Sequence, residues 1–172
     1  MRLIKAGDGF LPEMCEQLEL NFDLEERRDK CDQIKVFDKD KFVSWIIEED
    51  GVRVGFLNVW EFEKFTYFEH FVVYERFRGN GCGGRALNML LQKYKNVVLE
   101  AEPPEEGIRR RRINFYERHG LKVNPQFYWQ PPFRKGGKGC ELKILSYPDY
   151  LSDFDGVVAK IYKDVYNAEY KK

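Results

Sequence analysis

The chain has 172 residues, enough for one domain with a substantial buried core. Hydrophobic residues make up 43% of it and aromatic residues 16%, which excludes a disordered chain. Basic and acidic residues are equal at 29 each, so no overall field draws the protein to nucleic acid or to an anionic membrane.

No apolar run approaches the ~20 residues that span a bilayer, and the apolar part of MRLIKAGDGF is too short for a secretory signal. We therefore expect a cytoplasmic protein. Its cysteines contain no CxxC pair, which predicts reduced thiols and no metal site. The metal-ligating types are Cys15, Cys31, Cys82, Cys140, His70 and His119.

The first half of the chain predicts a strand, two helices and an antiparallel hairpin. The strand is residues 1–6, and the helices are 11–22 and 24–34, with Asp23 between them as an N-cap. Two alternating apolar runs in residues 42–62, joined by a tight turn, predict the hairpin.

A third strand is expected from Thr66 to Val73, and RGNGCGG follows it at residues 78–84. Behind the glycines, residues 85–94 have the apolar spacing of a helix. Strand, glycine loop and helix is the arrangement in which backbone amides and a helix N-terminus bind an anion. A phosphate-bearing ligand is therefore the first hypothesis, and a mobile surface turn is the alternative.

The second half predicts a strand at VVL in KNVVLEAE, parallel to the strand before the loop, and a helix from Glu105 and Glu106 to His119 with Gly120 as its C-cap. Further strands are expected at LKV, QFYW and CELKILSY, around the loop QPPFRKGGKG. A last helix, capped by Ser152, has an apolar stripe consisting of Phe154, Val157, Val158, Ile161, Val165 and Tyr166.

Two nucleotide-binding motifs were weighed for the glycine loop. Gly79, Gly81 and Gly84 fit GxGxxG, and Glu100 follows Gly79 by 21 residues, as a ribose-binding acid does in a Rossmann fold. Five residues separate the strand from the first glycine here, however, and the strand follows an antiparallel hairpin. A Walker loop is excluded because no GK[ST] follows.

A different pair of motifs resembles a known family. Arg78, Gly81 and Gly83 fit [QR]xxGx[GA] after a strand ending in VV, and NFYERHGL resembles a second signature on the following helix. Together they resemble the GNAT superfamily of acyl-CoA-dependent N-acyltransferases, and FEHFVV and LEAEPPE are most similar to bacterial members without a known acceptor. The resemblance implies an α/β fold in residues 1–147, with a mixed central sheet flanked by helices, and an extra C-terminal helix in 148–172 packed on this domain or on a partner.

The resemblance implies that acetyl-CoA binds where the strand before the loop splays away from VVLE. Unpaired backbone groups near the strand's end would hold pantetheine, and the loop amides with Arg78 would hold the pyrophosphate. Arg85 either contacts the phosphates or is an exposed helix residue. The cofactor residues expected are Phe71, Val72, Val73, Arg78, Gly79, Asn80, Gly81, Cys82, Gly83, Gly84 and Asn114.

Acyl transfer needs a neutral amine. For a lysine-like acceptor, deprotonation at pH 7 costs about 4.6 kcal/mol, so a base is useful. By family analogy we assign this role to Glu69, whose alternative is a buried ion pair with Arg27 or Arg28. We expect His70 to be packed on the other face of the strand, and a bulge would exchange the two assignments.

The family position of Tyr116 implies that it protonates the coenzyme A sulfur, and a core tyrosine is the alternative.

Cys82 could be acidified at a helix N-terminus but has no evident base, so a loop or packing role is favoured over a nucleophile. The run Arg109–Arg112 is mostly a solvated face, with one or two residues reaching phosphates or an acidic acceptor. An aromatic wall of the acceptor pocket, or simple packing, is expected of Tyr128, Trp129, Gln130 and Phe133.

The predicted function is transfer of an acetyl group from acetyl-CoA to a primary amine, of a small molecule or a peptide, by direct attack in a ternary complex. We expect a monomer or homodimer with neither nucleic acid nor membrane as partner. The alternative is a catalytically silent module that binds acyl-CoA.

Overall fold

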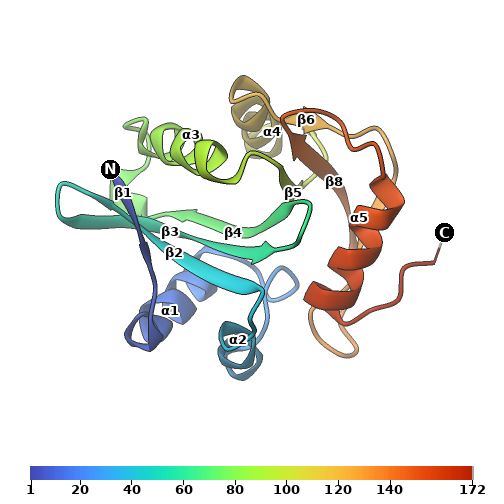
Figure 1. Ribbon diagram of the computed structural model, residues 1–172, viewed down its shortest axis with the longest axis horizontal. Coiled ribbons are helices and arrows are strands. Elements are labelled where there is room, and N and C mark those ends of the chain that lie inside the picture. The colour runs from blue at the N-terminus through green and yellow to red at the C-terminus, as the bar shows by residue number, and fades with distance from the viewer. Residues whose placement is uncertain (172) are drawn as a thin grey trace.

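A computed structural model describes residues 1–171 of the chain (Figure 1). A mixed sheet has the strand order β1-β2-β3-β4-β5-β8-β6, and β7 pairs with β8. Its strands are β1 (Arg2–Lys5), β2 (Phe42–Glu49), β3 (Val52–Glu61), β4 (Thr66–Val73), β5 (Val97–Ala101), β6 (Lys122–Val123), β7 (Tyr128–Gln130) and β8 (Cys140–Tyr147). The helices are α1 (Leu11–Asn21), α2 (Lys30–Phe37), α3 (Cys82–Tyr94), α4 (Ile108–Arg118) and α5 (Phe154–Ile161).

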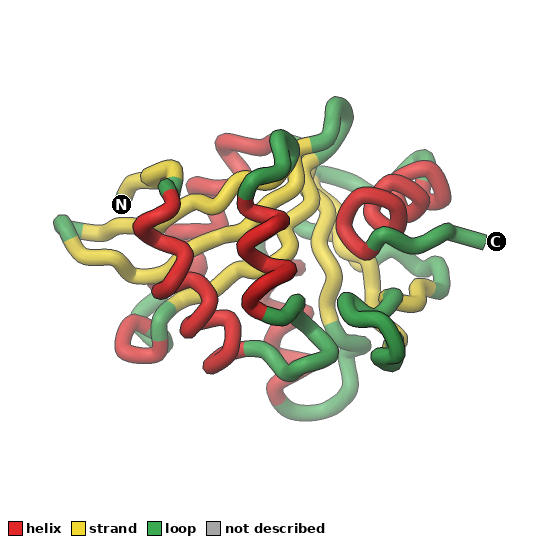
Figure 2. The backbone as a smooth tube through the Cα atoms, turned by 90° about the horizontal axis from the view of Figure 1, so that it is seen from below, coloured by secondary structure: helices red, strands yellow, loops and turns green. Residues whose placement is uncertain are grey.

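The sheet has an antiparallel half, a parallel step and another antiparallel half. Strands β1 to β4 pair antiparallel in order, β5 joins β4 in parallel, and β8 joins β5 antiparallel. Helices α3 and α4 cover one face, while α1, α2 and α5 lie on the other (Figures 1 and 2). This mixed sheet between two helical layers confirms the predicted fold class.

Each face of the sheet has its own core. Leu57, Phe68, Leu87 and Leu90 are buried between the sheet and α3, because α3 turns its apolar side inward. On the opposite face, one cluster under α1 includes Met14 and another surrounds the C-terminal segment.

The second helix starts later than predicted. Asp29, and not Asp23, is its N-cap, and the Asp29 side chain accepts a hydrogen bond from the Asp32 amide at 2.8 Å. The predicted helix 24–34 is therefore wrong at its start, and residues 22–29 form a connection between α1 and α2. This connection contacts the middle of β4, where Arg28 lies beside Glu69 and the Glu26 carbonyl beside His70.

Two other helix starts also differ from the prediction. Helix α4 begins after Gly107, whose φ is +75°, and Glu105 instead pairs with the side chain of Arg109. Helix α5 is capped by Asp153 in place of Ser152, since the Asp153 side chain accepts from the Gly156 amide at 3.0 Å.

The C-terminal segment packs on the sheet of its own chain. After α5 the backbone widens into a π-helical turn, Tyr162–Tyr166. The predicted stripe faces the sheet, where Phe154, Val158, Ile161, Val165 and Tyr166 are buried in one cluster with Trp60, Tyr67 and Tyr128. The described helices include none with the length and apolar character required to cross a membrane.

Candidate active site

Strands β4 and β5 diverge after a short paired stretch, as predicted. Their parallel pairing covers three residues on each strand and ends at Phe68 opposite Leu99. Beyond this point β4 continues to Val73 with only β3 beside it. Strand β5 continues to Ala101 and stays paired with β8. Within the described residues, one edge of β4 from Glu69 onward therefore has no strand partner, which leaves backbone groups open to a ligand.

A β-bulge lies at the point of divergence. His70 is opposite Asn58 and Phe68 is opposite Val59, so Glu69 is the extra residue. The extra residue shifts the alternation, and the Glu69 and His70 side chains meet on the α1/α2 face with Nδ1 of His70 3.3 Å from Oε2 of Glu69. The expectation that His70 lies on the opposite face from Glu69 is therefore wrong, and the reason is the bulge that was considered as an alternative.

The glycine loop has the geometry of an anion cradle. Gly79 and Gly81 have φ of +83° and +72°, values that other residues adopt only with strain. Gly81 precedes α3, no side chain caps this helix, and its first intrahelical bond runs from the Arg85 amide to the Gly81 carbonyl. The amides of the first turn, Cys82 to Gly84, have no protein acceptor among the described residues, so the loop fits a diphosphate.

The arginines near the loop are already engaged. Arg78 donates through Nε to the Val73 carbonyl at 2.8 Å and through its terminal nitrogen to Asn21. Arg85 forms an ion pair with Glu49 at 2.8 Å. Backbone amides therefore remain the main candidates for phosphate contact, and the two guanidinium groups shape the loop.

Two other loop residues, Cys82 and Gly84, pack against the rest of the protein. Cys82 is 3% exposed, and burial followed by the charge of Glu49 raises the pKa of its thiol, which agrees with a packing role and not with a thiol acidified by the helix N-terminus. A Cβ on Gly84 would lie 3.0 Å from Nε2 of His119, so this glycine permits α3 to approach α4.

Helix α4, which carries Asn114 and Tyr116, approaches the loop through Phe115. A Cβ built on Gly83 would lie 3.9 Å from Cζ of Phe115, which shows how near this part of α4 is to the first turn of α3. Both Asn114 and Tyr116 are partly buried. Burial raises the pKa of the Tyr116 hydroxyl, and within residues 1–171 this hydroxyl makes no hydrogen bond to another protein group. It therefore holds a proton that no protein group receives.

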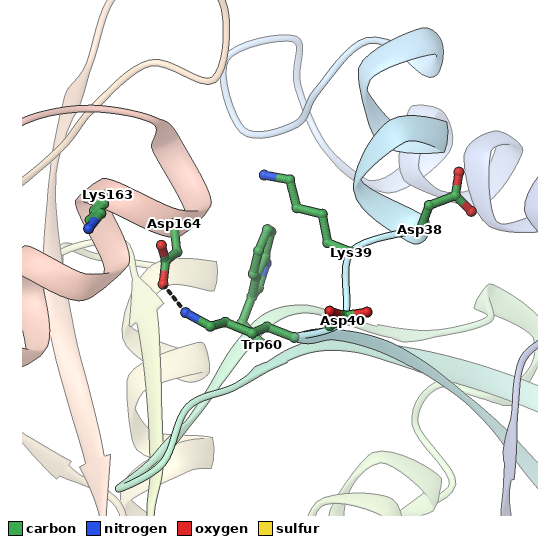
Figure 3. Close-up of a pocket in the computed structure, with 7 residues that line it drawn as sticks. Asp38, Lys39, Asp40, Trp60, Lys163 and Asp164 are labelled. Carbon is green, nitrogen blue, oxygen red and sulfur yellow. Dashed lines mark hydrogen bonds and ion pairs between the residues drawn. The ribbon is translucent and has the colours of Figure 1, made fainter.

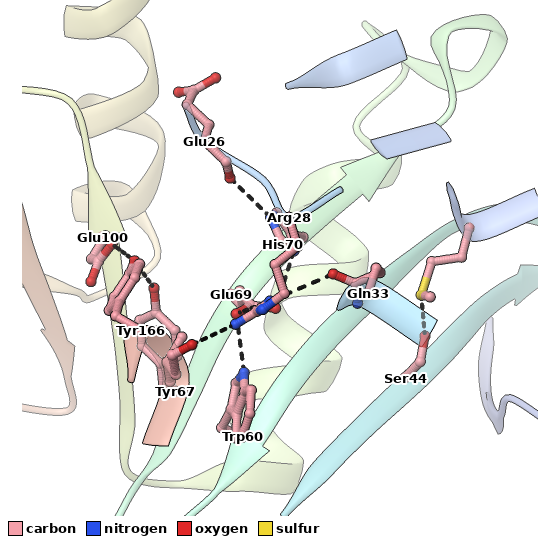
Figure 4. Close-up of polar contacts among 12 residues, drawn as sticks. Glu26, Arg28, Gln33, Ser44, Trp60, Tyr67, Glu69, His70, Glu100 and Tyr166 are labelled. Atoms are coloured by element: carbon pink, nitrogen blue, oxygen red, sulfur yellow. Dashed lines mark hydrogen bonds and ion pairs between the residues drawn. The ribbon is translucent and has the colours of Figure 1, made fainter. Parts of the chain in front are cut away.

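Glu69 forms a buried ion pair (Figure 4). Its side chain is 1% exposed, 2.8 Å from the Arg28 guanidinium, and accepts from Nε1 of Trp60 at 3.1 Å. Burial opposes ionisation, but the Arg28 charge and then the His70 side chain outweigh it and lower the pKa of Glu69 to about 2. This arrangement favours the structural alternative that the sequence left open, with Arg28 as the partner.

Sequence reasoning missed the most basic carboxylate of the site. Glu100 is the residue of β5 after the last β4 pair, and it accepts hydrogen bonds from the hydroxyls of Tyr128 and, at 2.6 Å, Tyr166 (Figure 4). Burial raises its pKa to about 7 although the tyrosines act in the opposite direction. The sequence does contain a sign of this residue, since Glu100 is an acid at the end of an otherwise apolar strand. It was interpreted only as a possible ribose-binding residue.

The predicted aromatic wall is mostly interior packing. Phe133 lies under the Arg28 guanidinium at 4.6 Å and stacks on His70, while Arg134 donates to the Leu24 carbonyl at 2.6 Å. These contacts hold the β7–β8 loop against the α1–α2 connection. Trp129, 48% exposed, is the member of the predicted wall that faces outward.

The arginine run is exposed, as expected. Arg109 and Arg112 form ion pairs with Glu102 at 2.9 and 3.1 Å. Arg110 and Arg111 are also exposed. The run therefore belongs to a solvated face tied to the segment after β5.

A pocket of about 420 Å³ lies away from the glycine loop (Figure 3). Trp60 lines it, with charged residues from the α2–β2 connection on one side and from the C-terminal segment on the other. Lys41 and Asp164 form an ion pair across it at 2.7 Å. Trp60 links it to the site, because its indole nitrogen donates to Glu69.

Known proteins resemble this chain in sequence and in fold. A structure from Bacteroides thetaiotaomicron, assigned provisionally to GNAT-family acetyltransferases, has a TM-score of 0.92 and 30% identity and covers 98% of this chain and 100% of its own. YjbC of Bacillus subtilis (strain 168), provisionally named an acetyltransferase, is 30% identical over 109 residues, or 62% of this chain and 55% of that protein. The matched part thus spans about half of that relative's length.

A more distant structure shares the fold. Arabidopsis thaliana NAA60 in complex with acetyl-CoA is 15% identical, with a TM-score of 0.62 over 85% of this chain and 97% of that one. The sequence profile of the Acetyltransferase (GNAT) family matches residues 11–121, which include both motifs of the predicted resemblance. The chain belongs to the acetyltransferase (GNAT) family.

Proposed function

We propose that this protein transfers an acetyl group from acetyl-CoA to a primary amine, of a small molecule or a peptide, by direct attack in a ternary complex. Family membership supports acetyl transfer from acetyl-CoA in general. The observation that most directly supports it in this chain is the unpaired edge of β4 beside the uncapped first turn of α3. The proposal includes action in the cytoplasm as a monomer or homodimer. The four free cysteines fit a reducing compartment.

The proposed cofactor contacts follow the open backbone. On the open edge, Phe71 would bond pantetheine through its main-chain groups and Val73 through its amide, which would also polarise the thioester carbonyl. Val72 lies between them, with its main-chain groups turned to Phe56 of β3. The loop residues 79–84 would hold the diphosphate through their amides, and Asn114 would contact the pantetheine side. When bound, acetyl-CoA supplies an acetyl group activated as a thioester.

Tyr116 is the proposed acid for the leaving sulfur. Its hydroxyl makes no hydrogen bond to another protein group within residues 1–171, and its raised pKa keeps it protonated at neutral pH. Glu69, the base expected from family position, would first have to leave Arg28, since the ion pair keeps it ionised and enclosed. Its proposed contribution is therefore to fix the bulge.

The test is release of free thiol from acetyl-CoA across a panel of primary amines, with acetyl-CoA affinity measured separately by calorimetry. We expect turnover with at least one amine, and about a 10²-fold lower kcat in Tyr116→Phe at unchanged affinity, because a general acid contributes on that order. The matched control is Tyr150→Phe, at an exposed tyrosine. Tight acetyl-CoA binding without turnover on any amine would support the silent module instead.

A further inference from the structure

We propose that Glu100 accepts the proton of the acceptor amine, and that Tyr166, from the C-terminal segment beyond the family-matched residues, is the positioning residue that orients its carboxylate. This inference rests on the proposed function and adds to it a base on β5 and an active-site role for the C-terminal extension. Four observations support it.

The first is position. β4 and β5 separate after Phe68 and Leu99, so Glu69 and Glu100 are the first residues beyond the junction, one on each strand. Glu100 is opposite Ile144 of β8, whose side chain is buried on the α5 face, and its own side chain meets the C-terminal tyrosine on that face. A carboxylate at this junction borders the space where the thioester is proposed to lie.

The second is a hydrogen-bond chain whose directions are determined by chemistry. The Gln130 amide nitrogen can only donate, and it donates to the Tyr166 oxygen at 2.8 Å. While Glu100 is ionised, the one proton of Tyr166 goes to Glu100, and in that state the Tyr67 hydroxyl, 3.3 Å away, donates to Tyr166 as well. The Tyr166 hydroxyl therefore points its proton at Glu100 and at no other group.

The third observation is that, among residues 1–171, no cation lies beside the Glu100 carboxylate. Unlike Glu69, Glu100 has no ion-pair partner among residues 1–171, and burial raises its pKa to about 7, close to the pH at which a base acts best. The titratable groups that face it are Tyr67 and Glu69 of β4, Tyr128 of β7, Cys140 of β8, and Tyr162 and Tyr166 of the C-terminal segment.

The fourth is how the C-terminal segment is anchored. The Asn167 amide closes the π-helical turn by donating to the Tyr162 carbonyl, and the next amide, that of Ala168, donates to the same carbonyl at 2.9 Å. Single π turns often occur at functional sites. The buried Arg28 donates to the Val165 carbonyl at 2.9 Å. The same arginine that neutralises Glu69 thus fixes the backbone next to Tyr166.

The proposed transfer is balanced in protons and bonds. An ammonium acceptor gives one proton to an Oε atom of Glu100, which then releases it to solvent. The freed lone pair forms the C–N bond while the C–S bond of the thioester breaks. The sulfur takes a proton from Tyr116, and the second amine proton replaces the one that Tyr116 gave.

The experiment measures the Glu100 carboxyl directly in the ligand-free protein, by NMR titration of ¹³C-labelled glutamate. Glu100→Gln identifies its signal. In Tyr166→Phe we expect the midpoint to rise by roughly half a unit or more, because the ionised form loses a donor. The control Tyr170→Phe removes a hydroxyl of the same segment that bonds Asp155, and it should leave the midpoint unchanged.

Kinetics on the active amine complete the test. The acidic limb of the kcat/KM profile should move upward by the same amount in Tyr166→Phe, and Glu100→Gln should lower kcat about 10²-fold at unchanged acetyl-CoA affinity. A Glu100→Gln enzyme with normal kcat, or a Tyr166→Phe titration equal to that of Tyr170→Phe, would overturn this inference alone. Wild-type protein that acetylates no amine would overturn the proposed function itself.

Discussion

Gly83 and Gly84 are adjacent in the first turn of α3, yet different neighbours surround them. A Cβ on Gly83 would lie 3.6 Å from Cγ2 of Val73, an ordinary contact at the edge of the open strand. A Cβ on Gly84 would lie 3.0 Å from the His119 ring. A methyl group at the first position therefore fits in the protein alone, whereas at the second position the His119 ring would have to shift by a few tenths of an ångström.

We predict that Gly83→Ala weakens cofactor binding without lowering the stability of the protein. Alanine favours a helix over glycine, so the free energy of unfolding should stay equal or rise by up to about 1 kcal/mol. The affinity for coenzyme A should fall by about tenfold, because the methyl group enters the space beside Val73. Gly84→Ala should instead lower stability by roughly 1 to 3 kcal/mol through overpacking.

Urea denaturation and calorimetric titration with coenzyme A measure the two quantities. If Gly83→Ala binds coenzyme A as tightly as the wild type does, the cofactor does not pass over this turn and the assignment of the loop fails.

Residues of the site differ in how far the sequence could predict them. The loop glycines belong to one local motif and Tyr116 to another, and the members of each motif lie within a few positions of one another, so the sequence was enough to locate them. The hydrogen bonds of Glu100 connect residues 28 and 66 positions apart along the chain. No local pattern records such contacts, and the C-terminal tyrosine could be seen only as part of an apolar stripe.

At the scale of elements, Arg28 connects three segments. It belongs to the α1–α2 connection, pairs with Glu69 of β4, and donates to the carbonyl of Val165 in the C-terminal turn. Its guanidinium also lies over the rings of Trp60 and Phe133, at 5.6 and 4.6 Å. A buried charge with these contacts stabilises mainly because its removal leaves another charge unpaired.

The prediction is that Arg28→Ala lowers the free energy of unfolding by about 3 to 5 kcal/mol, since Glu69 would remain buried without its cation. The control is Arg2→Ala, which removes an arginine from an exposed pair with Glu48 and should change stability by less than about 1 kcal/mol. Urea denaturation measures both. Equal effects in the two variants would show that Arg28 is hydrated and that its ion pair does not organise the site.

The same arginine explains why the predicted helix boundaries were wrong. Asp23 and Asp29 are both suitable N-caps, and local sequence does not choose between them. A helix starting at 24 would wind Arg28 into its first turns, whereas the observed loop lets its side chain reach Glu69 and a carbonyl 137 residues away. The order of elements was predictable from apolar periodicity, but this start was decided by contacts distant in sequence.

At the scale of the whole molecule, two carboxylates at one junction are shifted in opposite directions. The pKa of Glu69 is lowered to about 2 and that of Glu100 is raised to about 7. A lowered folded pKa adds stability that is present above the unfolded value and is lost as the pH falls through the folded one. Glu69 therefore stabilises the fold throughout the neutral range and contributes less only in acid.

Glu100 has the opposite effect and gives the last prediction. Its folded pKa, about 7, exceeds the ordinary value of 4.5, so the folded protein binds the extra proton and loses stability as the pH rises between these values. Over that range the wild type should lose roughly 2 kcal/mol, less than the full shift implies because Glu100 is partly exposed.

Glu100→Gln cannot lose this proton, so its stability relative to the wild type should improve by that amount between pH 5 and pH 8. Urea denaturation at several pH values measures the difference, with Glu69→Gln as the control that should show no such trend. Parallel curves for the wild type and Glu100→Gln would mean that the tyrosines keep this carboxylate ionised well below neutrality, and that it cannot serve as a base tuned to pH 7.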